Sequence, residues 1–235
     1  MLSFTEENYL KALLKIVLDS GVVAIGTNEL AAALAVKPAT ANDMLKKLRE
    51  KKLVDYEKYG KISLSEAGKK YALEVLRKHR IWETFLFEKL EFSWDEVHEV
   101  AEQLEHIQSQ KLIDKLDKYL NFPEVDPHGD PIPDKQGKLK QPFKKTLAEV
   151  SPGVTCRMIA VRDNSAPFLQ YVVRVGLGIN NEITVLDRQE YDEITRIEVN
   201  GMQSSVSQKF AGNIFVVCRR CDSGKNCREE HWKTP

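Results

Sequence analysis

Hydrophobic residues recur every three to four positions through most of the first 120 residues, which is the spacing of helices that bury one face. In residues 5–18 this repeat consists of Leu10, Leu13, Leu14 and Val17. Thr5 precedes two glutamates and is a plausible N-cap, so the pattern predicts a core-facing helix from there. Asn8 lies in its first turn as a neutral oxygen donor, and taken alone it is more typical of a surface residue.

Two shorter helical patterns follow. Thr27 or Asn28 is expected to cap an alanine-rich helix, and after a tight turn a second helix is expected over residues 38–51. Pro38 suits its first position, where the missing N–H costs nothing. The second helix buries leucines and exposes Lys46 and Lys47. Two short helices joined by a turn, the second of them basic, predict a helix-turn-helix whose second helix enters the major groove of DNA.

Residues 53–57 and 62–65 have the pattern of two strands around a basic tip, which predicts a β-hairpin, or wing. Helix, turn, helix and hairpin together favour nucleic-acid binding over a module for protein contacts. The residues expected to contact DNA are Lys37, Pro38, Ala39, Thr40, Asn42, Asp43, Lys46, Lys47, Lys58 and Lys61.

These residues are expected to differ in what they contact. Thr40, Asn42 and Asp43 are placed to face base edges, whereas the lysines are placed to neutralise phosphates. Asp43 is an acid in a basic neighbourhood, so it either accepts a hydrogen bond from a cytosine amine or interacts with the N-terminus of its own helix. We favour the second role.

The formal net charge of zero hides an asymmetry along the chain. Residues 37–80 contain thirteen Lys and Arg against six Asp and Glu, whereas residues 81–120 contain four against ten. A basic segment followed by an acidic one indicates a polyanion partner for the first and cations for the second.

Histidines and glutamates gather on the predicted helical faces between residues 79 and 106. Intervals of four residues place members of each run on one face beside a predicted core. The six residues are His79, Glu83, His98, Glu102, Glu105 and His106. Any one of them is more often a solvated residue or half of a salt bridge. Six on two helices favour a shared divalent cation, and oxygen and imidazole donors without a thiolate suit Mn(II) or Fe(II), with Zn(II) a possible substitute.

Residues 121–145 contain five prolines and two glycines, which predicts an extended linker. Beyond it, four short apolar or alternating runs predict strands, and residues 168–177 predict a short helix. The strands are expected at residues 154–161, 182–187, 194–199 and 214–217. This pattern favours a small β-barrel.

The cysteines do not form a secreted disulfide framework. Cys156 stands alone, while Cys218, Cys221 and Cys227 precede His231 in a short polar tail, where zinc binding or redox sensing is only a side hypothesis. The chain has no 18-residue apolar run and no secretory N-terminus, so we expect a soluble, cytoplasmic protein that does not enter a membrane.

Four stretches together resemble one known family. They are residues 5–10 (TEENYL), 77–83 (RKHR followed by Glu83), 97–106 (from Val97 to His106) and 126–133 (DPHGDPIP). Their order over residues 3–217 is similar to the metal-dependent repressors typified by the diphtheria toxin repressor and the manganese transport regulators. The resemblance implies a mainly α protein with an N-terminal winged helix-turn-helix, a helical metal-binding and dimerisation domain and a C-terminal SH3-like β-barrel. The implied domains are residues 1–72, 73–120, a linker at 121–145, 146–217 and a tail at 218–235.

The resemblance also implies two metal sites. One would use His79, Glu83 and His98 with Asp163 from the SH3-like domain, less plausibly Asn164. The other would use Glu102, Glu105 and His106 with position 8, which is Asn8 here. Iron-responsive relatives usually have cysteine at position 102, manganese relatives often have aspartate at position 8, and His98 is more typical of the iron type. On the hard-ligand argument we favour Mn(II) over Fe(II).

The implied function is a homodimeric repressor of metal-uptake genes that binds palindromic DNA with the metal as corepressor, and not an enzyme. Two rivals stay open at this point. A dinuclear carboxylate enzyme would normally repeat Glu-x-x-His on paired helices, whereas position 103, three before His106, is glutamine. A winged-helix regulator that senses an organic ligand or a partner, with the His/Glu cluster merely structural, would differ from the main hypothesis in its metal content.

Overall fold

The computed structural model describes residues 2–57, 60–139, 145–189 and 191–218, which fall into two compact units. One comprises residues 1–127 and 131–141, and the other residues 128–130 and 142–235. Within the described residues, no helix is long and apolar enough to cross a membrane.

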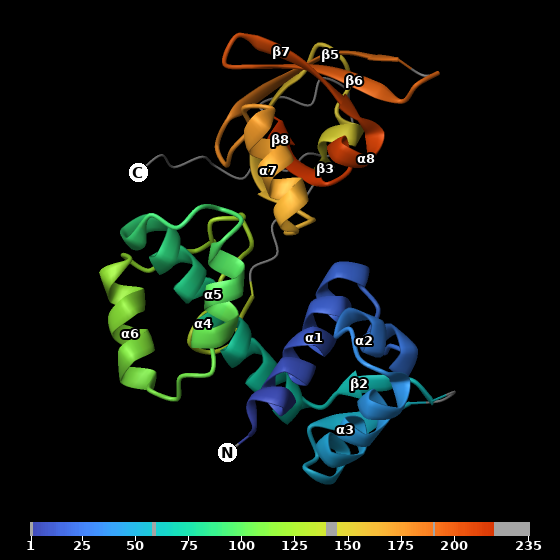
Figure 1. The fold of residues 1–235 in the computed structure, drawn as a ribbon, viewed down its shortest axis with the longest axis vertical. Helices are drawn as coiled ribbons and strands as arrows, with labels where there is room; N and C mark the ends of the chain where they lie inside the picture. Colours follow the sequence, from blue (N-terminus) through green and yellow to red (C-terminus); the bar gives the residue numbers. More distant parts are fainter. Residues whose placement is uncertain (1, 58–59, 140–144, 190, 219–235) are drawn as a thin grey trace. The chain divides into compact units, whose positions relative to one another are not determined.

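The first unit begins with a winged helix-turn-helix, as predicted (Figure 1). Its elements are α1 (Phe4–Ser20), α2 (Thr27–Ala33), α3 (Pro38–Glu50), β1 (Val54–Tyr56) and β2 (Ile62–Leu64). The two strands pair antiparallel, and their leucines, isoleucines and valines share one core with α1, α2, α3 and the start of α4. Lys58, expected at the wing tip, lies outside the described residues.

The predicted starts of the first two helices were each slightly wrong. Ser3, not Thr5, caps α1, where its hydroxyl accepts from the Glu6 amide and Glu6 accepts from the Ser3 amide. Gly26 precedes α2 without a side-chain cap, so neither Thr27 nor Asn28 has that role. Propensity favoured Thr5, but the reciprocal capping box satisfies two backbone groups instead of one.

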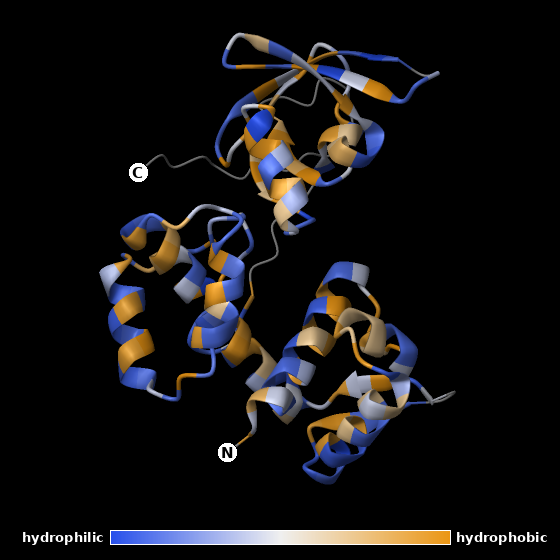
Figure 2. Ribbon diagram, in the orientation of Figure 1, coloured by the Kyte–Doolittle hydropathy of each residue, from blue (hydrophilic) through white to orange (hydrophobic). Residues whose placement is uncertain are grey.

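Helix α4 (Glu66–Leu90) continues from the winged helix into a second helical core with α5 (Val97–Leu104) and α6 (Gln110–Tyr119). Ser65 caps α4, and Gly68 lets the helix approach the wing closely, since a Cβ there would lie 1.9 Å from the Leu53 carbonyl oxygen. Figure 2 shows hydrophobic and hydrophilic bands alternating along α6. α5 is shorter than expected, because Glu105 is its C-cap and His106 lies in the following turn.

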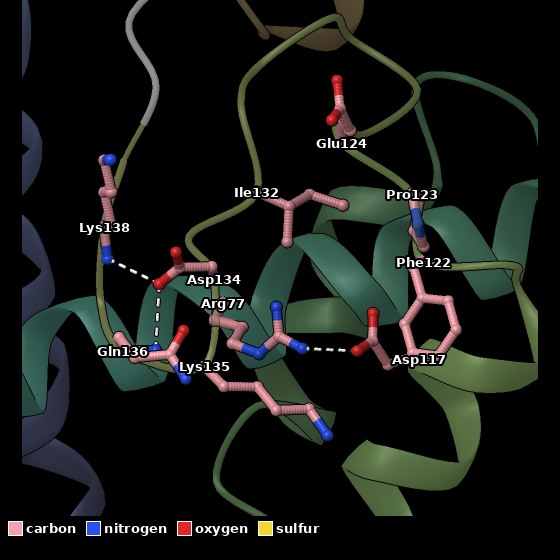
Figure 3. A pocket seen from close by; sticks show the side chains of 10 residues that line it. All are labelled: Arg77, Asp117, Phe122, Pro123, Glu124, Ile132, Asp134, Lys135, Gln136 and Lys138. Carbon is pink, nitrogen blue, oxygen red and sulfur yellow. Dashed lines mark hydrogen bonds and ion pairs between the residues drawn. The ribbon is translucent and has the colours of Figure 1, made fainter.

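The proline-rich segment contains no helix between residues 123 and 138, as expected, but it is packed on the helices of the first unit. Ile132 is buried in the second helical core, and the Arg77 guanidinium donates to the Pro133 carbonyl oxygen at 2.6 Å and to Asp117 at 2.7 Å. A pocket of about 320 Å³ lies between this segment and the helices (Figure 3). The segment is therefore held by buried contacts over much of its length.

The second unit contains a six-stranded antiparallel sheet in the order β3-β8-β4-β5-β6-β7, which is the expected SH3-like domain (Figure 1). The strands are β3 (Lys145–Thr146), β4 (Thr155–Val161), β5 (Glu182–Gln189), β6 (Ile194–Val199), β7 (Met202–Ser207) and β8 (Ile214–Cys218). The 3-10 helix η2 (Leu147–Glu149), α7 (Ala166–Arg174) and α8 (Gln208–Ala211) connect them.

The sequence pattern missed β3 and β7. β7 pairs with β6 along its whole length, yet only Val206 among its six residues is buried. An antiparallel strand that faces water needs few apolar residues, so its sequence gives little hydrophobic alternation to detect. The Cys221, Cys227 and His231 tail lies outside the described residues, while Cys156 and Cys218 face each other across β4 and β8 with their thiols reduced.

Candidate metal centre

Helix α4 holds the first two residues of the centre one turn apart. His79 and Glu83 are 5% and 2% exposed, and His79 Nε2 lies 3.0 Å from Glu83 Oε1. The spacing of four residues puts both side chains on the face that packs against α5. This burial argues against the alternative that His79 and Glu83 lie on a solvated helical face.

His98, near the start of α5, completes a group that we call the His79 triangle: Nε2 of His79, Oε1 of Glu83 and Nδ1 of His98. Nδ1 of His98 lies 3.1 Å from Nε2 of His79 and 3.0 Å from Oε1 of Glu83. Ligand atoms bound to one ion at about 2.1 Å and at right angles are themselves roughly 3 Å apart. The three atoms therefore have the separation expected of neighbouring ligands on one cation.

Three further residues form what we call the Glu105 cluster: Glu102, Glu105 and His106. Glu105 is fully buried, its Oε2 lies 2.6 Å from His79 Nδ1, and its Oε1 lies 3.7 Å from His106 Nε2. The carboxylate accepts the second ring N–H of His79, the usual arrangement for a histidine that binds a metal through its other nitrogen. Glu105 thus connects the cluster to the His79 triangle.

The Glu105 cluster reaches helix α1 through two residues that the sequence analysis missed. Lys11 Nζ lies 2.7 Å from Glu102 Oε1 and 2.7 Å from Glu105 Oε2. Glu7 Oε2 accepts from His106 Nδ1 at 2.6 Å and thereby directs the other ring nitrogen of His106 toward Glu105. No local spacing signals either contact, because the partners are 91 to 99 residues apart in the chain.

Two buried oxygens in this region have no hydrogen-bond partner among the described residues: Asn8 Oδ1 and Glu105 Oε1. An unsatisfied buried oxygen costs about 1 to 3 kcal/mol, and more when it is charged. A divalent cation bound at the Glu105 cluster would satisfy Glu105 Oε1. The carboxylate and imidazole groups therefore fit the metal ion that the sequence suggested. The expected role of Asn8 as a ligand stays a prediction, because its Oδ1 makes no hydrogen bond to the Glu105 cluster within the described part of the chain.

The electrostatics of the centre favour cations. Burial disfavours a charged His79, but the neighbouring Glu83 and Glu105 outweigh it and raise the pKa of His79 to about 9. For Glu102, burial acts to raise the pKa, yet Lys11 and the nearby histidines lower it overall. The carboxylate of Glu102 is therefore held as an anion that attracts metal ions.

Asp163, expected to complete one site, belongs to the second unit and lies between β4 and α7. Its carboxylate accepts a hydrogen bond from the Ser165 amide at 2.9 Å. Its role as a metal ligand stays a prediction, as does that of Asn164.

The residues expected to contact DNA lie on one exposed stretch. The described ones are all exposed: Lys37, Pro38, Ala39, Thr40, Asn42, Asp43, Lys46, Lys47 and Lys61. Asp43 pairs with Lys46 at 3.1 Å and lies beyond the first turn of α3. The prediction that Asp43 interacts with the N-terminus of its own helix is therefore wrong. The Arg49 guanidinium lies 4.9 Å from the Tyr56 ring centroid and connects α3 to the wing.

Comparison with protein families gives three matches in the order of the observed parts. Residues 1–62 match the N-terminal DNA-binding domain of the iron dependent repressors, and residues 65–134 match their metal binding and dimerisation domain. Residues 145–218 match the FeoA domain. Together these matches span the described chain almost completely.

Solved structures agree with these matches. A manganese-dependent transcriptional repressor in complex with manganese is 32% identical, with a TM-score of 0.80 over 91% of this chain and 99% of the other. The manganese regulator SloR is 30% identical, with a TM-score of 0.73 over 91% of this chain and 98% of the other. Both similarities extend over the whole length of the relative.

Curated relatives match over shorter stretches. The iron-dependent repressor IdeR of Mycobacterium tuberculosis (strain ATCC 25618 / H37Rv) is 40% identical over 72 residues, which is 31% of each protein. IdeR of Mycobacterium leprae is 28% identical over 167 residues, 66% of this chain and 64% of that protein. The matched part thus spans less than two thirds of each of these relatives.

Proposed function

The chain belongs to the family of iron-dependent repressors, and from this premise we propose that it represses transcription by binding DNA when Mn(II) or Fe(II) occupies its metal centre. The observation that carries the proposal is the His79 triangle, in which three buried or half-buried donor atoms from two helices lie 3.0 to 3.1 Å apart.

The winged helix would supply the DNA contacts. Exposed lysines on α3 and at Lys61 are placed to neutralise phosphates, whereas Thr40 and Asn42 near the start of α3 are placed to reach base edges in the major groove. Repeated on a twofold axis, two such helices would bind half-sites about 34 Å apart. A palindromic operator is therefore the expected partner.

The helical part of the first unit would supply the dimer contacts. Large apolar side chains are exposed on and around its helices, among them Phe87, Leu90, Tyr119 and Phe122 at 43% to 63%. Exposed apolar groups of this size often mark an interface. The match of residues 65–134 to a metal binding and dimerisation domain supports a homodimer.

The metal would act by connecting α1 to the residues that follow α5. The His79 triangle would hold one ion through His79, Glu83 and His98, and the Glu105 cluster would hold another with Asn8, next to Glu7. An ion shared in this way biases an existing equilibrium toward the conformation that it binds better, by about 1 to 3 kcal/mol in typical cases. We propose that this conformation is the one that fits the operator.

The choice between Mn(II) and Fe(II) rests on ligand chemistry. Oxygen and imidazole donors without a described thiolate are hard to intermediate ligands, and the whole-length structural relatives named above are described as manganese-dependent or as a manganese regulator. We propose Mn(II) as the physiological metal, with genes for metal uptake as the targets. The comparisons support this metal-dependent function over the organic-ligand alternative.

The proposal is tested by measuring DNA affinity against metal. A duplex would first be selected from a random pool with the full chain and Mn(II), then labelled for fluorescence anisotropy with Mn(II), anaerobic Fe(II), Zn(II) or a chelator. We expect Mn(II) to tighten binding about 5- to 150-fold and the chelator to reverse it. Glu105→Gln should lose this response, whereas Glu99→Gln, at an exposed glutamate of α5, should keep it. Equal affinity of the wild type with metal and with chelator would refute the corepressor role.

A further inference from the structure

Lys11 places an ammonium group among the carboxylates of the Glu105 cluster. Its side chain is only 11% exposed, and Nζ lies 2.7 Å from an oxygen of Glu102 and 2.7 Å from an oxygen of Glu105. A protonated lysine has three donors and no acceptor, so it cannot be a metal ligand. A divalent ion bound through the same oxygens must therefore displace the ammonium or bind beside a like charge.

The competition concerns one of the two groups of ligands far more than the other. In the His79 triangle, His79 and His98 contact each other and Glu83, and His79 Nδ1 also contacts Glu105. Each member of the triangle has an oxygen or a ring nitrogen that a metal can bind. In the Glu105 cluster, Lys11 holds both carboxylates directly. The Lys11 ammonium and a metal ion on the same carboxylates would repel each other strongly, even with the screening of a protein surface. This repulsion is enough to weaken metal affinity by roughly tenfold or more.

The contacts of Lys11 also duplicate the connection that the metal is proposed to make. Lys11 lies on α1, and its partners lie at the end of α5, 91 and 94 residues away in the chain. A cation from outside would join the same two segments through some of the same oxygens. Exchange of the Lys11 ammonium for a metal ion would thus leave α1 connected to the end of α5. Only the metal would also bind His106 and the unsatisfied Glu105 Oε1.

We propose that Lys11 is an affinity-determining residue: it competes as an internal cation for Glu102 and Glu105, so that the His79 triangle fills at a lower metal concentration than the Glu105 cluster. This inference rests on the proposed function, because it needs the Glu105 cluster to bind a metal. It differs from a purely structural role, in which Lys11 would stabilise the fold without any effect on metal affinity.

The test is a titration of the full chain with Mn(II) alone, followed by the electron paramagnetic resonance signal of the unbound ion and by calorimetry. We expect the wild type to bind one ion tightly and another more weakly. Lys11→Met should tighten the weaker class by about tenfold or more and leave the tighter one unchanged. Lys11→Arg keeps the positive charge and should retain the weak class. Lys15→Met, at an exposed lysine one helical turn further along α1, should behave as the wild type.

A Glu83→Gln background assigns the classes, since it removes the tighter one and leaves only the Glu105 cluster to be measured. Thermal unfolding without metal shows whether each variant folds. Lys11→Gln, which keeps a polar group, replaces Lys11→Met if the methionine variant does not fold.

Equal or weaker affinity of the second class in both neutral variants would overturn the inference, because Lys11 would then be structural or would help to organise the site. If the wild type binds two ions and switches DNA binding while Lys11→Met has unchanged affinities, only the inference fails. If neither the wild type nor Lys11→Met binds Mn(II), the proposed function fails as well.

Discussion

The His79 triangle and the Glu105 cluster lie side by side and are connected by the hydrogen bond between His79 and Glu105, yet they satisfy their polar groups differently. In the triangle, one carboxylate and two imidazoles approach one another at 3.0 to 3.1 Å. In the cluster, Lys11 supplies a positive charge to both carboxylates at 2.7 Å. A metal entering the triangle would meet donor atoms already at suitable separations, whereas a metal entering the cluster would have to exchange with an ammonium group.

This difference shows why a ligand list alone does not describe a metal centre. Glu105 is buried and Glu102 is partly exposed, and both contact the Lys11 ammonium group. Two sites of similar composition can then respond to different metal concentrations. The following changes would break or sharpen the distinction.

Replacement of Glu105, which connects the two groups, should have the largest effect on stability and on metal binding. Glu105→Ala would leave the Lys11 ammonium with one partner fewer and His79 without the acceptor for Nδ1, both in buried surroundings. Removal of one partner from such a buried group typically costs about 3 to 5 kcal/mol. We expect a loss of this size in chemical denaturation and weaker Mn(II) binding in both classes. Glu99→Ala, exposed on α5, should change neither, and loss of only one class in Glu105→Ala would show that the two groups are independent.

Glu83→Gln should separate the two groups. The amide keeps the shape of the side chain but removes the anion of the His79 triangle, so the tighter Mn(II) class should weaken by about 100-fold or more while the weaker class remains. Calorimetry would measure both. Equal loss of the two classes would mean that the triangle and the cluster fill as one cooperative unit.

Glu7→Gln should have a smaller effect that is confined to the Glu105 cluster. Glu7 accepts from His106 Nδ1 at 2.6 Å and is not required as a ligand in this account. Loss of such an orienting carboxylate commonly weakens metal binding 10- to 100-fold. The weaker Mn(II) class should change by that factor, and a change in the tighter class would show that Glu7 acts on the His79 triangle as well.

Glu6→Gln should have the smallest effect and none on metal binding. Burial tends to raise the pKa of Glu6, but Lys51 and the Ser3 amide outweigh it, so the pKa lies below its ordinary value. A lowered pKa in the folded state contributes stability above the ordinary pKa, near 4.5, which is lost as the pH falls through the folded value. Glutamine can still close the capping box, so we expect Glu6→Gln to cost at most about 1 kcal/mol at pH 7 through loss of the Lys51 ion pair, and to flatten the acid side of the stability profile. Altered Mn(II) affinity would contradict the separation of Glu6 from the centre.

The sequence pattern predicted the parts of the molecule whose signals are local. The intervals of four residues placed His79 with Glu83 and His98 with Glu102 on shared helical faces, and Pro38 marked the start of α3. These features depend on helical spacing and on backbone chemistry within a few residues.

The contacts of α1 could not be predicted in the same way. Asn8 was expected to meet the cluster, whereas Glu7 contacts His106 and Lys11 contacts Glu102 and Glu105. The choice among neighbours on one helix depends on how α1 packs against α4 and the residues after α5, which no short-range pattern encodes. Family resemblance pointed to the correct turn of the helix but not to every side chain.

The central claim is that a cation shared by side chains from separate helices controls DNA binding, and reciprocity gives its most direct test. Any factor by which Mn(II) raises the affinity for DNA must equal the factor by which that DNA raises the affinity for Mn(II). We would titrate the full chain with Mn(II) in the presence and absence of the selected duplex. The account predicts that the duplex raises the affinity of at least one Mn(II) class by about 5-fold or more. Identical Mn(II) affinities with and without the duplex would contradict it.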